Sequence, residues 1–121
     1  FRDNNNKDSN MRKLLILFLL PFTAMCQDFS DGMVAVEFNA SFNKANEVGW
    51  LTKLTDCEVE RVDITTDSRW ASEYKIVVVP TLVVFNNNEE AKRFQANIMM
   101  TMEATRKEVQ DSIDEITMEA F

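Results

Sequence analysis

Apolar residues occur along the chain in short runs separated by polar segments, and several of these runs have the character of strands. Residues 34–38 are almost all apolar, which is typical of a buried strand, and residues 59–64 form a second strand candidate. Residues 82–85 form a third candidate. Residues 91–96 then return as its hairpin partner across a turn at residues 86–88, because asparagine tolerates left-handed backbone conformations.

Helical spacing appears between these strands and again at the end of the chain. Residues 43–55 carry an apolar stripe, a short helix is expected to follow the potential N-cap residues 66–68, and residues 101–120 form a long amphipathic segment. The apolar positions of these three helices are Val48, Leu51 and Leu54; Trp70 and Tyr74; and Val109, Ile113 and Ile116.

The predicted element order is β-α-β-α-β-β-α, which defines an α/β fold. A strand–helix–strand start requires a parallel crossover, and the later hairpin adds an antiparallel edge. We therefore expect a mixed central sheet flanked by helices.

The first 26 residues have a different organisation, with the features of a secretory signal peptide. Residues 1–10 are polar, and Arg12 and Lys13 follow Met11 and precede the apolar residues 14–20. A basic region, a short apolar region and small residues at a cleavage site are the parts of such a peptide. We expect an upstream extension at 1–10, a signal peptide at 11–26 and a domain at 27–121, giving a secreted or periplasmic protein.

Two alternatives apply to the same segment. The apolar run is too short for a permanent bilayer anchor, which needs about 20 residues, so no stable membrane span is expected after processing. Acylation of Cys26 as a lipoprotein is the lesser alternative, because Met25 is a poor match for the small residue that such processing prefers. The segment could instead be part of a buried core.

Composition excludes several classes of function. A chain of 121 residues is expected to form one domain, and its net charge of −7 gives nucleic acid no electrostatic attraction. There is no histidine, which removes histidine-based catalysis and most metal ligation. Two cysteines and two glycines cannot supply a zinc site or a glycine-rich phosphate loop, so we expect no metal and no cofactor.

The sequence resembles the thioredoxin family over about residues 34–119. The resemblance rests on Val36-Glu-Phe-Asn-Ala40, on Val62-Asp-Ile64, and most specifically on the pattern Tyr74-x-Ile-x-x-Val-Pro-Thr81 that leads into residues 82–85. It implies a thioredoxin-like three-layer fold with a cis peptide bond between Val79 and Pro80. In the family, the cis-proline loop faces an active dithiol, and the backbone before the proline pairs with extended substrate chains.

The dithiol itself is missing from this sequence. In thioredoxins a Cys-x-x-Cys motif opens the helix after the first of these strands, whereas here the four positions read Asn43-Lys-Ala-Asn46. A carboxamide can neither form a mixed disulfide nor carry two electrons. Phe42 occupies the position of the aromatic residue before the motif, and Asn39 a position where many members have tryptophan. We therefore expect no catalytic residue of the dithiol type.

Two other titratable side chains are candidates for chemistry. Cys57 is the only thiol left after the expected processing; it is either a redox-active cysteine or a small apolar residue at a helix–strand junction. Its acidic neighbours Asp56 and Glu58 raise the pKa of a thiol, which disfavours a reactive thiolate. Glu37 aligns with a buried acid of thioredoxins and is either a general base or a structural residue.

The sequence therefore predicts a binding module rather than an enzyme. We expect a redox-inactive protein that binds an extended peptide or a partner protein in a groove built from Phe42, Asn43, Asn46, Val79 and Pro80. The alternatives are a thiol–disulfide activity, or an accessory role in one, through Cys57, and a purely structural domain that dimerises. The methionines at 99, 100 and 102 are expected to fill the core or to form a flexible contact surface.

Overall fold

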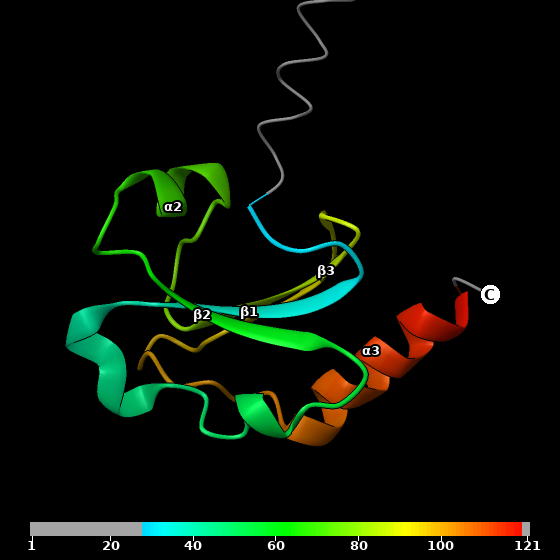
Figure 1. Ribbon diagram of the computed structural model, residues 1–121. Coiled ribbons are helices and arrows are strands. Elements are labelled where there is room, and N and C mark those ends of the chain that lie inside the picture. Colours follow the sequence, from blue (N-terminus) through cyan, green and yellow to red (C-terminus); the bar gives the residue numbers. More distant parts are fainter. Residues whose placement is uncertain (1–27, 120–121) are drawn as a thin grey trace, which may run out of the picture.

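A mixed four-stranded sheet forms the centre of residues 28–119, the part of the chain that this computed structural model describes (Figure 1). The expected extension at 1–10 and signal peptide at 11–26 lie outside the described residues. In chain order the elements, with η for a 3₁₀ helix, are β1 (Met33–Asn39), η1 (Ser41–Asn46), η2 (Leu51–Lys53), β2 (Glu58–Asp63), α2 (Arg69–Glu73), β3 (Thr81–Asn86), β4 (Glu89–Gln95) and α3 (Arg106–Glu119).

The strand order in the sheet is β2-β1-β3-β4. β1 pairs in parallel with β2, whereas the β1–β3 and β3–β4 pairs are antiparallel. The two central strands are almost fully buried, while the outer strands β2 and β4 carry most of the charged residues of the sheet. Charged side chains on edge strands discourage pairing with other chains. The predicted α/β class and mixed sheet are confirmed.

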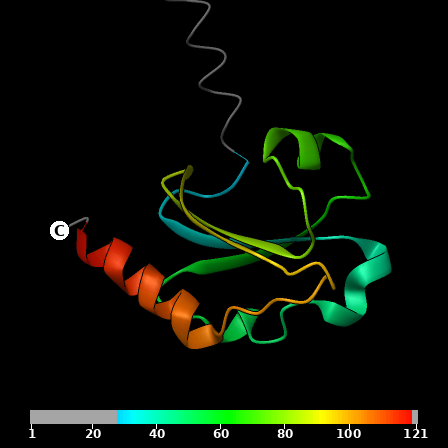
Figure 2. The ribbon, with the colours of Figure 1, turned by 180° about the vertical axis from the view of Figure 1, so that it is seen from behind.

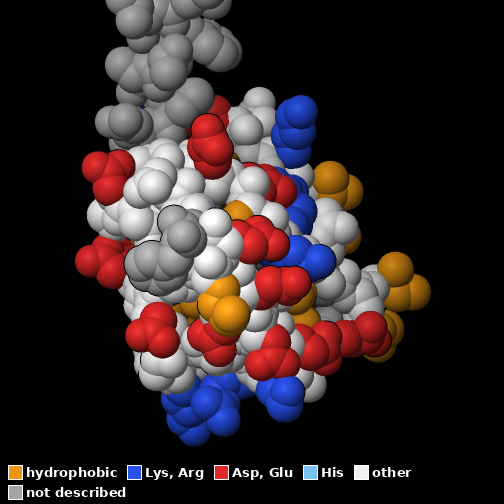
Figure 3. Space-filling model, turned by 90° about the vertical axis from the view of Figure 1, so that its right-hand side faces the viewer, with side chains coloured by type: hydrophobic (Ala, Val, Ile, Leu, Met, Phe, Trp, Pro, Cys, Tyr) orange, Lys and Arg blue, Asp and Glu red, His pale blue; other side chains and the backbone are white. Residues whose placement is uncertain are grey.

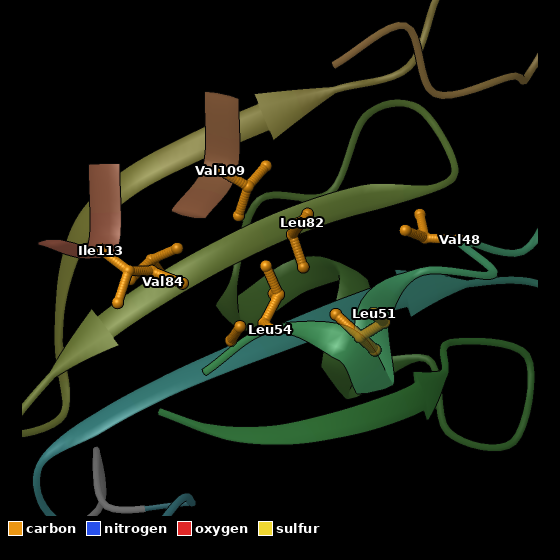
Figure 4. Close-up of a cluster of buried hydrophobic side chains, with 8 residues drawn as sticks. Val48, Leu51, Leu54, Leu82, Val84, Val109 and Ile113 are labelled. Atoms are coloured by element: carbon orange, nitrogen blue, oxygen red, sulfur yellow. The ribbon is translucent and has the colours of Figure 1, made fainter. Parts of the chain in front are cut away.

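Helices cover both faces of the sheet, so the fold has three layers. α2 packs over one face, while η1, η2 and α3 lie over the other (Figures 1 and 2). Alternate residues of β1 and β3 point to opposite faces, so that Val36 and Val83 lie on the α2 side and Ala35 and Leu82 on the other. Figure 4 shows Val109 and Ile113 of α3 beside β3, and Leu51 of η2 beside β1, in one cluster on this face.

The predicted asparagine turn between β3 and β4 is confirmed. Asn87 and Asn88 have φ of 52° and 66°, in the left-handed region that asparagine tolerates. The Oδ1 atom of Asn87 accepts a hydrogen bond of 2.9 Å from the Gly32 amide, which ties the turn to the start of β1. β4 begins earlier than predicted, at Glu89, because the hairpin pairs Glu89 with Asn86 directly after the turn.

The prediction of one helix over residues 43–55 is wrong, because the segment forms two separate 3₁₀ helices. A buried ion pair explains the interruption. The Glu37 carboxylate accepts the Val48 amide at 2.7 Å, and Arg61 Nη2 donates to the Val48 carbonyl at 2.9 Å. The Val48 amide is therefore bonded to a strand side chain rather than to a helical neighbour, and the Val48 carbonyl is shared between Arg61 and the Leu51 amide (3.2 Å). Gly49 also weakens helix propagation there.

The last helix also begins later than predicted, at Arg106 rather than residue 101. Thr105 Oγ1 accepts the Glu108 amide at 3.2 Å, an N-terminal cap that defines the start. Met100 has φ of 60°, which is incompatible with a helix at that point. Val109 and Ile113 are buried as expected. No helix within residues 28–119 is long and apolar enough to cross a membrane.

Candidate functional site

The candidate site lies where the parallel strands β1 and β2 end. Asn39 pairs with Asp63 at these ends, and η1 starts directly afterwards at Ser41. A polar cleft of about 550 Å³ opens between η1 and β2. Its lining residues are Glu37, Asn39, Ala40, Ser41, Lys44, Glu47, Arg61, Val62 and Asp63.

Asn43, at the first position of the absent dithiol, is buried and makes its hydrogen bonds within the protein. Only 3% of the residue is exposed. Its Nδ2 lies within hydrogen-bond distance of three oxygens, namely Asn39 Oδ1 (3.1 Å), the Met100 carbonyl (3.0 Å) and the Val79 carbonyl (3.4 Å). Asn46 Nδ2 donates to Asn43 Oδ1 at 2.8 Å. Asn43 thus links η1 to the cis-proline segment and to the turn before α3, and its amide is not free for a ligand.

The other predicted groove residues divide into surface and buried positions. Phe42 is 73% exposed and Asn46 is also exposed, whereas the side chains of Val79 and Pro80 are buried. The peptide bond between Val79 and Pro80 is cis. Among the described residues the Val79 N–H makes no backbone hydrogen bond. A ligand at this place would therefore meet the Phe42 ring and the backbone of Val79.

Glu37 is fully buried on the η1 side of β1 and is paired. Its carboxylate receives hydrogen bonds from the Arg61 guanidinium and the Val48 amide. Burial raises the pKa of Glu37 above its ordinary value, and the hydrogen bond from Val48 and the charge of Arg61 partly oppose that rise. These contacts fix the chain between η1 and η2, which supports the structural interpretation of Glu37 over a general base.

Cys57 lies at the opposite end of the sheet from Asn43. The next residue, Glu58, pairs with Val34 at the start of β1, whereas Asn39 is at the end of β1. The length of a strand of this size places Cys57 about 20 Å from the asparagines. Burial, with a smaller effect from Asp56, raises the pKa of the thiol, which reduces its thiolate fraction. The structure does not bring Cys57 together with the cis-proline segment.

Sequence reasoning missed two contributors to this site. Arg61 is the partner of Glu37 and lies directly opposite it in the parallel register, so aligning the two predicted strands could have identified it. The turn at residues 97–101 also borders the site, through the Asn43–Met100 bond. The methionine cluster was a signal for it, but Met102 packs on the core whereas Met99 is exposed.

Comparisons with known proteins agree with this fold. The thioredoxin family model matches residues 3–111. A mutant thioredoxin from Halobacterium salinarum is similar, with a TM-score of 0.56 and 24% identity over 70% of this chain and 74% of that one. Schistosoma mansoni thioredoxin is also similar, with a TM-score of 0.57 and 20% identity over 78% of this chain and 86% of that one.

A designed protein also shares the fold, with a TM-score of 0.55 and 18% identity over 73% of this chain and 83% of that one. No curated protein matches the sequence. The family match spans most of the chain, and the sheet order, the flanking helices and the cis Val79–Pro80 bond accord with it. The chain therefore belongs to the thioredoxin family.

Proposed function

We propose that this protein is a redox-inactive member of the thioredoxin family that binds an extended peptide or a segment of a partner protein beside the cis-proline. The observation that carries the proposal is the pair of asparagines at the dithiol positions. Neither side chain supplies a nucleophile, because both are carboxamides. Asn43 is buried and hydrogen-bonded, and Asn46 donates a hydrogen bond to it. Beside them lie the exposed Phe42 and the Val79 N–H, which has no backbone partner within residues 28–119.

These two features suit an extended chain. A backbone N–H without a partner can donate a hydrogen bond to a carbonyl of an added strand, which is the basis of strand-addition recognition. An exposed aromatic ring next to it can hold a side chain, since aromatic residues contribute strongly to binding surfaces. Thiol chemistry through Cys57 is the weaker alternative, because the thiol lies at the far end of the sheet and burial raises its pKa.

Two assays test the proposal together. Reduction of insulin disulfides should show no activity above the uncatalysed rate, with an ordinary thioredoxin as the positive control. Fluorescence anisotropy with a labelled pool of short unstructured peptides should show binding that Phe42→Ser weakens. Met118→Ser is the matched control, since Met118 is an equally exposed apolar residue on the last turn of α3. Insulin reduction by the native protein, or equal binding by both variants, would contradict the proposal.

We also propose that the protein is exported after removal of residues 11–26. The support is the order of Arg12 and Lys13, the apolar residues 14–20 and the small residues Ala24 and Cys26. The mass of the protein recovered from the exported fraction should correspond to a chain that starts at Gln27. A chain retained inside the cell with residues 11–26 intact would contradict export, and a lipid-modified Cys26 would establish the lipoprotein alternative.

A further inference from the structure

The turn at residues 97–101 is firmly held by a single side chain. Asn97 Oδ1 accepts hydrogen bonds from the Met99 amide (2.9 Å), the Thr101 amide (3.1 Å) and the Thr101 hydroxyl (3.0 Å). The Met100 amide donates to the Asn97 carbonyl at 3.0 Å, and the Asn97 amide donates to the Thr101 carbonyl at 3.1 Å. The turn is therefore preformed rather than loosely connected.

This ordered turn displays two large apolar side chains to solvent. Ile98 is 94% exposed and Met99 is 72% exposed. Leaving such side chains in water forgoes about 1.5–3 kcal/mol of burial each. Figure 3 shows hydrophobic side chains projecting at one edge of a surface on which acidic side chains are prominent. Neighbouring apolar side chains that are exposed together on an ordered segment mark an interaction site more often than isolated exposed apolar residues do.

The turn borders the groove of the proposed function. Asn43 Nδ2 reaches both the Met100 carbonyl and the Val79 carbonyl, so the turn and the cis-proline segment meet at one buried side chain. Phe42 is the residue next to Asn43 and is exposed. Three exposed apolar side chains, those of Phe42, Ile98 and Met99, thus belong to the elements that surround the Val79 backbone.

Two carboxylates lie next to the elements that carry this apolar surface. Asn97 Nδ2 donates to Glu103 Oε1 at 3.1 Å, which places one carboxylate against the turn. Next to Phe42, Asp63 accepts a hydrogen bond from the hydroxyl of Ser41, and this bond lowers the pKa of Asp63. The cations that line the neighbouring cleft are Lys44 on η1 and Arg61, and Arg61 is paired with Glu37. The whole chain has a net charge of −7.

We propose that the groove selects extended peptides in which a bulky apolar residue is flanked by lysine or arginine. Ile98 and Met99 hold the apolar side chain together with Phe42, and Glu103 and Asp63 attract the basic side chains. The inference rests on the proposed function, since it names the peptide class for the same groove. Methionine suits such a contact because its flexible thioether adapts to side chains of different shapes.

Three labelled peptides of equal length test this selection by fluorescence anisotropy. One combines leucine with flanking lysines, the second replaces the lysines by glutamates, and the third replaces the leucine by serine. The protein should bind the first at least about tenfold more tightly than either other peptide, a difference of about 1.4 kcal/mol. Its affinity for the first should fall as salt is added, because charge attraction between exposed groups is screened.

Matched variants locate the contacts. Ile98→Ser/Met99→Ser should weaken binding of the leucine–lysine peptide about tenfold, and Met118→Ser should not. Glu103→Gln keeps the contact with Asn97 but removes the charge, so it should weaken binding and reduce the salt dependence, whereas Glu115→Gln on α3 should do neither. Unchanged urea midpoints show that each variant is folded.

The outcomes separate the two proposals. If Phe42→Ser abolishes binding but Ile98→Ser/Met99→Ser does not, or if the glutamate peptide binds as well as the lysine peptide, the groove functions but this selection is refuted. If the native protein binds none of the peptides or the random pool, the proposed function fails as well. If native protein sediments as a dimer that Ile98→Ser/Met99→Ser dissociates, a second copy covers the surface and the peptide proposal is overturned.

Discussion

The pair of Glu37 and Arg61 is expected to hold the interrupted segment between η1 and η2 in place, and Arg61→Met tests this directly. Methionine keeps an unbranched apolar stem but removes the charge and the donors to Glu37 and to the Val48 carbonyl. The Glu37 carboxylate would remain buried with only the Val48 amide as its partner. The folded state then holds a buried charge without a counter-ion.

The structure sets the size of the effect. Removing one partner of a fully buried ion pair costs about 3–5 kcal/mol. The Arg61 side chain is 36% exposed, so water already solvates part of the guanidinium and the pair is worth less than a fully buried one. We expect a loss of about 2–3 kcal/mol in the free energy of unfolding at pH 7. A domain of this size is stable by about 5–15 kcal/mol, so the variant should still fold.

The effect should depend on pH in a defined direction. Because burial raises the pKa of Glu37 above 4.5, the folded state binds this proton more tightly than the unfolded state does. The contribution of Glu37 to the free energy of unfolding therefore decreases as pH rises from 4.5 through the raised pKa of the folded state. Arg61 limits that rise, so its removal extends the interval upward. The cost of Arg61→Met should be largest at neutral pH and should shrink toward pH 4.5, because the raised pKa means that a growing fraction of the carboxyl is protonated in both folded proteins as pH falls.

Urea unfolding followed by the fluorescence of Trp50 and Trp70 measures this cost. With a slope of about 1–3 kcal/mol per molar urea, a loss of about 2–3 kcal/mol should lower the midpoint by about 0.7–3 M at pH 7. Lys107→Met is the control, because Lys107 pairs with Asp111 at 2.9 Å on the exposed face of α3 and such pairs contribute little. A loss no larger than that of the control, or a loss equal at pH 7 and pH 4.5, would refute the reasoning.

Three further predictions concern the asparagines and the thiol. Asn43→Ala removes the side-chain donor from the buried Val79 carbonyl and from the part-buried Met100 carbonyl, so it should lower the free energy of unfolding by about 1–3 kcal/mol, more than Asn46→Ala, in urea titrations; equal losses would contradict the linking role. Asn43→Cys/Asn46→Cys should form a disulfide on air oxidation, detectable by mass, because the two side chains are in contact at 2.8 Å; persistent free thiols would show that the geometry is unsuitable. Alkylation of Cys57 at pH 8 should be slower in the folded protein than in urea, since burial raises the thiol pKa; equal rates would contradict that placement.

Local patterns were sufficient to predict most of the sheet, because its determinants are close together in the sequence. The central strands are nearly continuous apolar runs, and the asparagines at 87 and 88 can adopt the left-handed turn that joins β3 to β4. The two asparagines in place of the dithiol could also be located from the residues between the first strands. These features depend on neighbouring residues rather than on the final packing.

The remaining features depend on contacts between distant segments. The break between η1 and η2 arises because Glu37 and Arg61 bond to Val48, and helical spacing alone contains no sign of this. Likewise, the sequence predicted Asn43 and Asn46 as part of the binding groove. In the fold, the Asn43 amide is bonded to Asn39, Val79 and Met100. Val79 and Met100 are distant in the sequence, and only the folded chain brings them close to Asn43.

Binding of a peptide beside the cis-proline is the central claim, and an NMR titration of the ¹⁵N-labelled protein tests it most directly. Addition of the leucine–lysine peptide should shift the amide resonances of Phe42, Val79, Ile98 and Met99, while those of α3 near Met118 stay in place. Shifts that gather around Cys57 at the other end of the sheet, or no shifts at saturating peptide, would contradict the account.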